Sequence, residues 1–250
     1  MTRFRLLIEY HGGAYSGWQM QPDRPSVQGA LQRALASIGE PDASVYGAGR
    51  TDAGVHALAQ VGHVDVTKDW SGFALANAIN HGLKGEGVAV LGAEPVSNEW
   101  HARFSAVGRA YVYRIVSRRA HLTLECGLAW NVKVPLDLAA MNAAAERLVG
   151  LHDFTTFRST ECQSASAVKT LDILRAREVD GAIVVEAEAR SFLHNQVRSL
   201  VGALEWVGRG KWTPDDVTAA LEAKDRSACA PVAPAHGLYL ARVDYPTDDA

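Results

Sequence analysis

One short stretch of the chain, GRTDAGVHA at residues 49–57, sets a single carboxylate among glycines and other small residues. Glycine can adopt positive φ and lets another molecule's backbone approach closely. Arg50, two residues before the carboxylate of Asp52, can keep that group ionised and can present a planar cation to a phosphate or a base. The alternative is an ordinary Asx turn, which an Asp before Ala-Gly commonly forms. The stretch is a candidate site, and the rest of the chain decides between these interpretations.

The composition is that of a folded protein with one large domain or two modest ones. The 250 residues are 48% hydrophobic and 21% charged, enough for proper cores. No apolar run approaches the roughly 18 residues that a membrane span needs, so we expect a cytoplasmic protein. Cys126, Cys162 and Cys229 are far apart and form no Cys-x-x-Cys pair. We therefore expect buried small hydrophobes rather than a disulfide framework or a thiolate metal site.

Charge is unevenly distributed along the chain. The net charge of −3 is not that of a strong nucleic-acid binder, for which a basic domain is the first electrostatic sign. Between residues 103 and 119, however, every charged residue is an arginine, and Phe104, Tyr111 and Tyr113 are interleaved with them. This segment is either a basic, aromatic surface for nucleic acid or a strand whose exposed face is simply solvated by arginine.

The first half of the chain has the element order β-α-β-β-α-β. Apolar residues alternate from Phe4 to Tyr10, which predicts a strand with one apolar face. Ser26 precedes apolar residues at three- and four-residue spacings up to Ile38, which predicts a capped helix. Further strands are expected near residues 44–47, 60–66 and 88–95, with a helix near 73–80.

The second half follows a similar order without a sequence repeat. Residues 111–117 alternate as a strand, and Asp137 caps a helix that runs to Leu148. Two strands flank the turn Val179-Asp180-Gly181 as a hairpin, at residues 170–178 and 182–188. The remaining elements are a helix with an apolar stripe from Leu193 to Leu204, a helix start with a capping box at Thr213-Pro214, and a strand at 238–245.

These elements predict an α+β fold of two tandem split β-α-β (ferredoxin-like) halves. The expected division is residues 1–108, which carry the Asp52 loop, and residues 109–250. The antiparallel sheets of the two halves are expected to join edge to edge into one extended sheet, with a central cleft where a ligand could lie.

Besides residues 49–57, five more blocks stand in order along the chain. They are Tyr10-His11-Gly12-Gly13-Ala14-Tyr15-Ser16-Gly17-Trp18-Gln19, Ser26-Val27-Gln28, His101-Ala102-Arg103-Phe104-Ser105-Ala106 with Tyr111-Val112-Tyr113, Phe192-Leu193-His194-Asn195-Gln196-Val197-Arg198, and Gly237-Leu238-Tyr239-Leu240. Together the six blocks resemble the tRNA pseudouridine synthase A family, over a span from about Leu6 to Tyr245. The sequence departs from the family at His11, where Asp is usual, and at Asn195-Gln196, which replace a more frequent His-Met.

The resemblance implies isomerisation of uridine to pseudouridine at positions 38, 39 and 40 in the anticodon arm of tRNAs, by a cytoplasmic homodimer without a cofactor or metal. The chemistry is compatible with one carboxylate, because moving uracil from its nitrogen to its carbon 5 gains and loses no net charge. Glycoside hydrolysis divides its work between two carboxylates, one of which activates water. An enzyme that returns the base to the same ribose should instead exclude water. Asp52 is by resemblance the lone carboxylate, acting either as nucleophile at the anomeric carbon or as base at the neighbouring ribose carbon.

The resemblance also implies supporting roles for four residues. Arg50 is suited to occupy the space that the flipped base vacates and to hold nearby phosphates, the alternative being a surface arginine. Tyr111 matches a tyrosine that stacks on the flipped uracil and helps a proton leave carbon 5, the alternative being a core residue. Arg198 is paired by the family pattern with Asp52, as a second cation that keeps the carboxylate charged. Leu240 packs beside the base or belongs only to the core.

Other classes of function are less well supported. Gly47-x-Gly49 lacks the third glycine of a dinucleotide fingerprint, and the chain has no phosphate-binding loop with Gly-Lys. His56, His63 and His101 show no zinc spacing and are interpreted as structural histidines. A non-catalytic tRNA-binding or folding protein on the same scaffold remains the alternative from another class. Loss of Asp52, Tyr111 or Arg198 would indicate it, and all three are present.

Overall fold

The computed structural model of the chain describes residues 1–246 and forms two compact units. The first unit comprises Met1–Val107 together with the chain from Tyr239 onward, and the second comprises Gly108–Leu238. The expected division puts all of residues 109–250 in one half. The structure differs in its last strand, which belongs with the first unit because it pairs with a strand of that unit.

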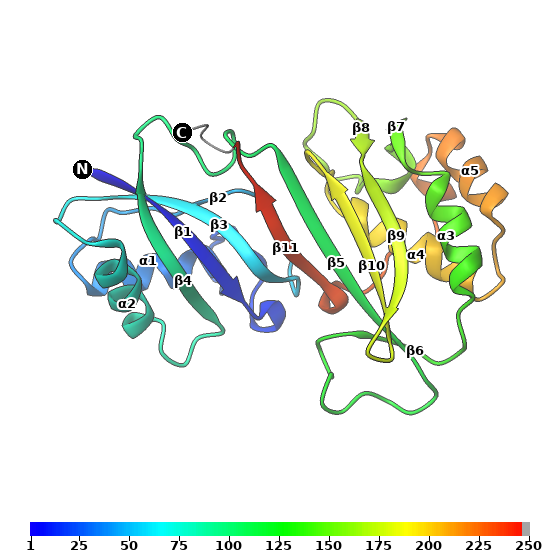
Figure 1. The fold of residues 1–250 in the computed structure, drawn as a ribbon, viewed down its shortest axis with the longest axis horizontal. Helices are drawn as coiled ribbons and strands as arrows, with labels where there is room; N and C mark the ends of the chain where they lie inside the picture. The colour runs from blue at the N-terminus through cyan, green and yellow to red at the C-terminus, as the bar shows by residue number, and fades with distance from the viewer. Residues whose placement is uncertain (247–250) are drawn as a thin grey trace. The chain divides into compact units, whose positions relative to one another are not determined.

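The sheet of the first unit has the strand order β4-β1-β3-β11, and β2 also pairs with β3. Its strands are β1 (Thr2–Tyr10), β2 (Tyr46–Gly47), β3 (His56–Val66), β4 (Val88–Val96) and β11 (Leu238–Asp244) (Figure 1). The strand β1 runs antiparallel to both of its neighbours, β3 and β4. The strand β11 joins β3 in parallel, with Tyr239 opposite His56 and Leu240 opposite Ala57.

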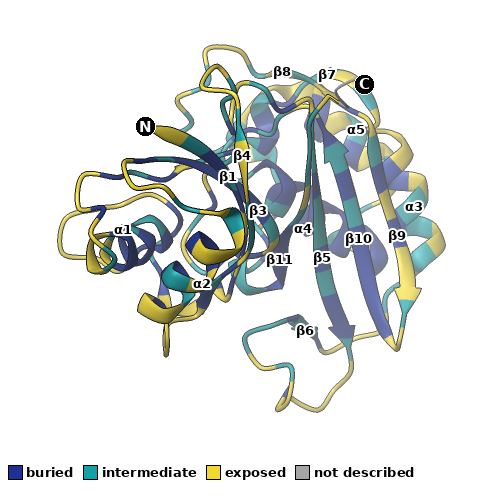
Figure 2. Ribbon diagram, turned by 60° about the vertical axis from the view of Figure 1, so that its left-hand side comes forward, coloured by how far each residue is buried: buried dark blue, intermediate teal, exposed yellow. Residues whose placement is uncertain are grey.

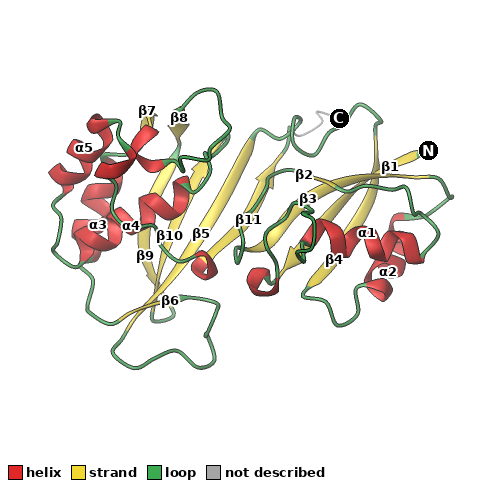
Figure 3. Ribbon diagram, turned by 180° about the vertical axis from the view of Figure 1, so that it is seen from behind, coloured by secondary structure: helices red, strands yellow, loops and turns green. Residues whose placement is uncertain are grey.

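Two helices, α1 (Val27–Ser37) and α2 (Gly72–Gly82), lie on one face of this sheet (Figure 3). Each begins at a serine whose hydroxyl accepts a hydrogen bond from the backbone of the first turn, as Ser26 does from Gly29 and Ser71 from Ala74, both at 3.2 Å. The core is formed by the alternate residues of β1 and the apolar stripes of the helices. Fully buried members are Phe4, Leu6, Ile8, Leu31, Leu35, Leu75 and Ile79.

The sheet of the second unit has the order β5-β10-β9, antiparallel throughout, and β6 adds to β5 in parallel. Its strands are β5 (Gly108–Ser117), β6 (Trp130–Val132), β9 (Ile173–Val179) and β10 (Ala182–Ala189). A separate two-stranded sheet consists of β7 (Gly150–Asp153) and β8 (Val168–Leu171). The predicted hairpin is confirmed: Asp180 and Gly181 join β9 to β10 with φ of 51° and 76°, the two positive values that a type I′ turn needs.

Three α-helices belong to the second unit, α3 (Leu138–Glu146), α4 (Gln196–Gly208) and α5 (Pro214–Ala223). The helix α4 is its most buried helix, with both apolar and polar residues enclosed (Figure 2). The predicted start of α5 is confirmed as a complete capping box between Thr213 and Asp216, with Pro214 in the first turn. Single 3-10 turns occupy η1 (Gly12–Ala14), η2 (Thr155–Phe157), η3 (Arg226–Ala228) and η4 (Ala235–Gly237).

The predicted α+β class with mainly antiparallel strands is confirmed, and three local expectations are wrong. The strand expected over residues 170–178 is divided at Asp172 into β8 and β9. Leu193 precedes α4, which begins at Gln196 because Asn195 has a left-handed φ of 62° and ends the preceding turn. The cysteines are not core residues, since Cys126 is exposed and Cys162 and Cys229 are half-buried, all in loops or turns. Within residues 1–246, every helix is too short or too polar to span a bilayer.

Candidate active site

The carboxylate of Asp52 is carried by a tight turn between β2 and β3. The backbone N–H of Val55 donates to the carbonyl of Asp52 at 3.2 Å, and Gly54 has a φ of 79° at the third position, where a type II turn requires a positive value. Main-chain atoms close this turn. Asp52 itself is half-buried, whereas Arg50 is exposed on the same loop.

The segment that follows β1 holds this loop from the side. The backbone N–H of Trp18 donates to the carbonyl of Thr51 at 3.1 Å, and the backbone N–H of Gly54 donates to the carbonyl of Tyr15 at 3.3 Å. The hydroxyl groups of Tyr10 and Thr51 are 2.7 Å apart. Burial raises the pKa of Tyr10 to about 12, so its hydroxyl stays protonated and available to this bond. The residues on both sides of Asp52 are therefore fixed by the Tyr10–Trp18 segment.

Two glycines allow this close packing. A Cβ on Gly12 would lie 2.0 Å from the carbonyl oxygen of Val55, and one on Gly17 would lie 2.6 Å from that of Thr51. Gly17 also has a φ of +105°, which side chains rarely adopt. The first glycine-rich block and the Asp52 block are thus two parts of one structure, because the first can pack against the second only with glycine at these positions.

Two glutamines complete the support of the loop. The side chain of Gln28 donates to the carbonyl of Val45 at 3.0 Å and accepts from the N–H of Met20 at 3.0 Å, which joins the two segments that flank α1. The side chain of Gln60 on β3 donates to the carbonyl of Gly49 at 2.9 Å.

Gln60 is a residue that the sequence analysis missed. It is 0% exposed, and its Oε1 atom has no hydrogen-bond partner within residues 1–246. The signal was present in the sequence, since a glutamine stands at an inward position of a strand where an apolar residue is usual.

Leu240 lies in the same unit as Asp52. It pairs with Ala57 at the beginning of β3, a few residues beyond Asp52, and it is 0% exposed. Its neighbour Tyr239 stacks on His56, with ring centroids 4.7 Å apart. Leu240 is therefore a core residue, and its placement beside a bound base stays a prediction.

Tyr111 and Arg198 belong to the second unit. Tyr111 lies on β5 opposite Ala187, half-buried, with its ring edge-on to Phe192 at 5.2 Å. Arg198 lies in the first turn of α4 and donates from Nε to the carbonyl of Ala233 at 2.8 Å. The backbone of Ala233 donates back to the carbonyl of Arg198 at 3.1 Å. The first bond orients the guanidinium group, and the second holds the backbone that carries it.

Arg198 and Tyr111 lie on the same side of the second unit. Burial raises the pKa of the Tyr113 hydroxyl, and the positive charge of Arg198 opposes that shift. The hydroxyl of Tyr113 donates to the carbonyl of Pro234 at 2.8 Å, in the segment that also holds Arg198. Because alternate residues of a strand share a face, Tyr111 projects to the same side of β5 as Tyr113.

The departures from the family pattern occupy structural roles. His11 caps η1 by accepting a hydrogen bond from Gly13 at 3.3 Å, a role that an Asp side chain also fills. Asn195 has a left-handed backbone, which Asn tolerates, and its side-chain oxygen accepts from Nη1 of Arg198 at 2.8 Å. Gln196 is buried and accepts from the backbone of Leu193 at 2.8 Å.

Each of His56, His63 and His101 accepts a hydrogen bond from a backbone N–H. Nδ1 of His56 accepts from Gly12 at 3.0 Å, and Nδ1 of His63 accepts from Ala102 at 3.2 Å. Nδ1 of His101 accepts from Arg103 at 3.1 Å. Nowhere in residues 1–246 do three or more His, Cys, Asp or Glu side chains gather as a metal site would require.

The family is decided by comparison with known sequences. A sequence model described as tRNA pseudouridine synthase matches residues 6–105 and 144–246. These ranges include parts of both units and the candidate residues Arg50, Asp52, Arg198 and Leu240, whereas Tyr111 lies between them. The chain belongs to this family.

Relatives of similar length carry the same name. The protein named tRNA pseudouridine synthase A in Ruegeria sp. (strain TM1040) is 57% identical to this chain, and the alignment covers 98% of this chain and 96% of the relative. The protein of the same name in Rhodopseudomonas palustris (strain HaA2) is 56% identical to this chain, and the alignment covers 98% of this chain and 100% of the relative. A crystal structure of a Cbf5-Nop10-Gar1 complex aligns over 94% of this chain and 57% of that chain at 11% identity, with a TM-score of 0.33, which is too low to support an argument.

Proposed function

We propose that this member of the tRNA pseudouridine synthase family isomerises uridine to pseudouridine at positions 38, 39 and 40 in the anticodon arm of tRNAs, in the cytoplasm and as a homodimer. The observation that carries the proposal is the construction of the Asp52 loop. A single half-buried carboxylate stands on a turn that is closed by its own main chain and held by Tyr15, Trp18 and Gln60. Such fixed positioning is what a carboxylate needs to act on one bond of a bound nucleotide.

The proposed reaction conserves atoms and charge. The bond between the anomeric carbon and the uracil nitrogen breaks, the base turns within the site, and carbon 5 bonds to the same anomeric carbon. The proton that leaves carbon 5 is balanced by one that returns to the ring nitrogen. Asp52 acts either as the nucleophile that holds the ribose during the turn or as the base that removes a proton from the neighbouring ribose carbon.

The other predicted site residues have roles that suit their surroundings. Arg50 is exposed on the Asp52 loop, where it can enter the stack that the flipped base leaves. Tyr111 keeps a partly open ring for stacking on uracil. Arg198 has its guanidinium direction fixed by Ala233, which suits it to hold a carboxylate in place. Leu240 supports the start of β3 from within the core and, in this proposal, limits the space for the base.

The direct test is release of tritium from unmodified tRNA that carries tritium at uracil carbon 5. Release must depend on the protein and must coincide with pseudouridine in the anticodon arm when the product RNA is mapped. Full-length tRNA that is bound but releases no tritium would instead favour the non-catalytic tRNA-binding alternative. Release with pseudouridine at uridines outside the anticodon arm would contradict the proposed positions and leave the reaction class intact.

A further inference from the structure

A surface turn after β4, in the first unit, presents an aromatic ring to solvent. Phe104 is 74% exposed, although phenylalanine is normally buried. Its ring lies against the ring of His101, with centroids 4.4 Å apart, and the guanidinium of Arg103 lies 5.7 Å from its centroid. The turn thus offers a planar apolar surface and a cation at the same place.

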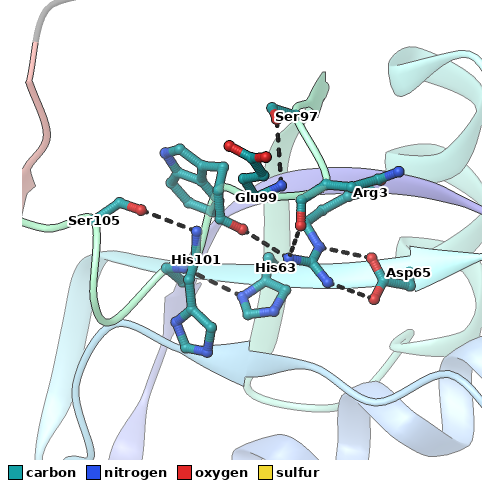
Figure 4. A network of polar contacts seen from close by, with 10 residues as sticks. Arg3, His63, Asp65, Ser97, Glu99, His101 and Ser105 are labelled. Atoms are coloured by element: carbon teal, nitrogen blue, oxygen red, sulfur yellow. Dashed lines mark hydrogen bonds and ion pairs between the residues drawn. The ribbon is translucent and has the colours of Figure 1, made fainter.

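The turn is held by hydrogen bonds within itself. The N–H of His101 donates to the hydroxyl of Ser105 at 3.0 Å, and the N–H of Ser105 donates to the carbonyl of His101 at 2.9 Å (Figure 4). Nδ1 of His101 accepts from the backbone of Arg103 at 3.1 Å and of Phe104 at 3.4 Å. The backbone that carries the exposed ring is therefore already ordered, and a ligand that stacks on the ring would not have to order the turn.

The sheet below holds the turn from a second side. Nδ1 of His63, on β3, accepts from the backbone of Ala102, and the hydroxyl of Tyr245 donates to the carbonyl of Ala102 at 2.6 Å. The rings of His63 and His101 are 4.5 Å apart, and Tyr46 stacks on His63 at 5.1 Å. A line of rings thus runs from β2 to Phe104.

Arg3 fixes the chain that enters the turn. It donates to the carbonyl groups of Asn98 at 2.6 Å and Trp100 at 2.9 Å, and it pairs with Asp65 at 2.7 Å (Figure 4). In this pair, Nε and Nη2 of Arg3 donate to the two carboxylate oxygens of Asp65. Such a two-pronged geometry is more specific than a single ion pair.

The turn packs against the segment that precedes the Asp52 loop. Ala102 packs in one buried cluster with Ala48 and Val61, and Ala48 is two residues before Arg50. The turn therefore packs against the strand end that leads into the Asp52 loop, on the same unit. The charge also suits RNA, because Arg103 places a cation beside the ring of Phe104.

We propose that Phe104 and Arg103 form a stacking platform for an unpaired base of the substrate tRNA. Unpaired bases in RNA loops stack on aromatic rings and on guanidinium planes, whichever base is present. The platform rests on the proposed function for the identity of its RNA and is distinct from the pocket for the reacting base. It would bind a nucleotide other than the reacting one, and its removal is expected to change affinity rather than chemistry.

The test is a set of substitutions at Phe104, with unmodified tRNA binding and tritium release measured for each. Because removal of an aromatic stacking partner weakens binding by about tenfold or more, Phe104→Ala should raise the dissociation constant and KM by about that factor and leave kcat within about twofold. Phe104→Tyr and Phe104→Trp should bind like the wild type, and Phe104→Leu should bind like Phe104→Ala.

The matched control is Phe73→Ala, which removes a phenylalanine that is also highly exposed, at 82%, from α2 of the same unit. It should leave both constants unchanged, and thermal unfolding should show that all variants remain folded. Wild-type binding by Phe104→Ala, or equal binding by Phe104→Leu and the wild type, would overturn the platform while tritium release continued. Loss of binding in Phe104→Ala would support it even in a protein that released no tritium, so failure of the platform and failure of the proposed reaction are distinguishable.

Discussion

At the scale of single residues, the proposed chemistry depends on one carboxylate. Asp52→Asn keeps the shape of the side chain and the main-chain bond from Val55 that closes the turn. We expect tritium release to fall by at least about a hundredfold, because a covalent or general-base role is lost. Affinity for tRNA, measured by filter binding, should change little, since it comes from many phosphate contacts. Release within about tenfold of the wild type would remove Asp52 from the chemistry.

Arg50 should affect a different step, the extrusion of the base. Because unstacking costs less for a mismatched or loop uridine than for one in a stem, Arg50→Ala should lose activity mainly on paired targets. The measurement compares kcat/KM on tRNAs whose target uridine is paired, mismatched or in the loop. Arg24→Ala, which removes another exposed arginine of the same unit, is the control for loss of charge alone. Equal defects of Arg50→Ala on all three substrates would contradict this role.

At the scale of elements, the glycine-rich segment after β1 should set the geometry of the Asp52 loop. Gly17→Ala introduces a side chain at positive φ, at a cost of about 1–2 kcal/mol, and a Cβ that collides with the carbonyl of Thr51. Gly85→Ala is the matched control, because Gly85 also has a positive φ, +87°, but nothing within 4 Å of its Cβ position. Both variants should lower the unfolding temperature, Gly17→Ala more than Gly85→Ala.

Only Gly17→Ala should lower kcat, by about tenfold or more, since small displacements of a catalytic group are costly. Comparison of kcat for the two variants therefore separates backbone strain from displacement of the loop. A normal kcat in Gly17→Ala would show that the position of Asp52 does not depend on this packing.

His63, on β3, should make the free energy of unfolding depend on pH. His63 is 2% exposed and accepts from Ala102 through Nδ1, so its neutral form is required in the fold. Burial, with the nearby charges of His101 and Arg3, lowers the pKa of His63 to about 4, and Asp65 opposes this. The unfolded chain binds this proton below about pH 6.5. The stability is therefore fully present above that pH and is lost as the pH falls toward 4, by up to about 3 kcal/mol.

Denaturant unfolding at a series of pH values measures this contribution. His63→Asn retains an acceptor without the titrating ring, so its free energy of unfolding should fall less than that of the wild type between pH 6.5 and 4. His81→Asn, at an exposed position of α2, should follow the wild-type profile. If the free energies of unfolding of His63→Asn and the wild type fell in parallel with pH, His63 would not be the source of this pH dependence.

The elements also show what the sequence could and could not predict. Helices α1 and α5 were predictable because their caps and apolar spacing are local, as at Ser26 and Thr213. The parallel pairing of β11 with β3 was not, because nothing local in residues 238–245 specifies a partner so distant along the chain. The exposure of Cys126 was missed for the same reason, since burial of a loop residue depends on what the loop packs against.

The candidate site, too, could be predicted only in part from the sequence. Asp52 and Arg50 could be found from one short block, but the residues that hold them come from elsewhere. The roles of Gly17 and Gln60 depend on contacts with Thr51 and Gly49 that no spacing reveals. Family resemblance located the blocks, and the packing of one block on another explains why they occur together.

At the scale of the whole molecule, the net charge of −3 limits how a single chain can bind tRNA. Cations must be concentrated on part of its surface, and a chain of 26.9 kDa is small beside a whole tRNA, whose elbow and anticodon arm both need to be held. Two subunits could divide that work. We therefore expect sedimentation equilibrium at micromolar concentration to give twice the chain mass.

Activity should depend on this association. If one subunit holds the body of the tRNA while the other acts on its anticodon arm, dilution below the dimer dissociation constant should lower kcat/KM on full-length tRNA. An isolated anticodon stem-loop lacks the body, so its already weaker reaction should change less on dilution. The control is the same dilution with added unlabelled protein carrying Asp52→Asn, which restores the dimer without adding active sites. A monomer that remains fully active on full-length tRNA when dilute would contradict the expectation, because each chain would then bind and present the stem-loop alone.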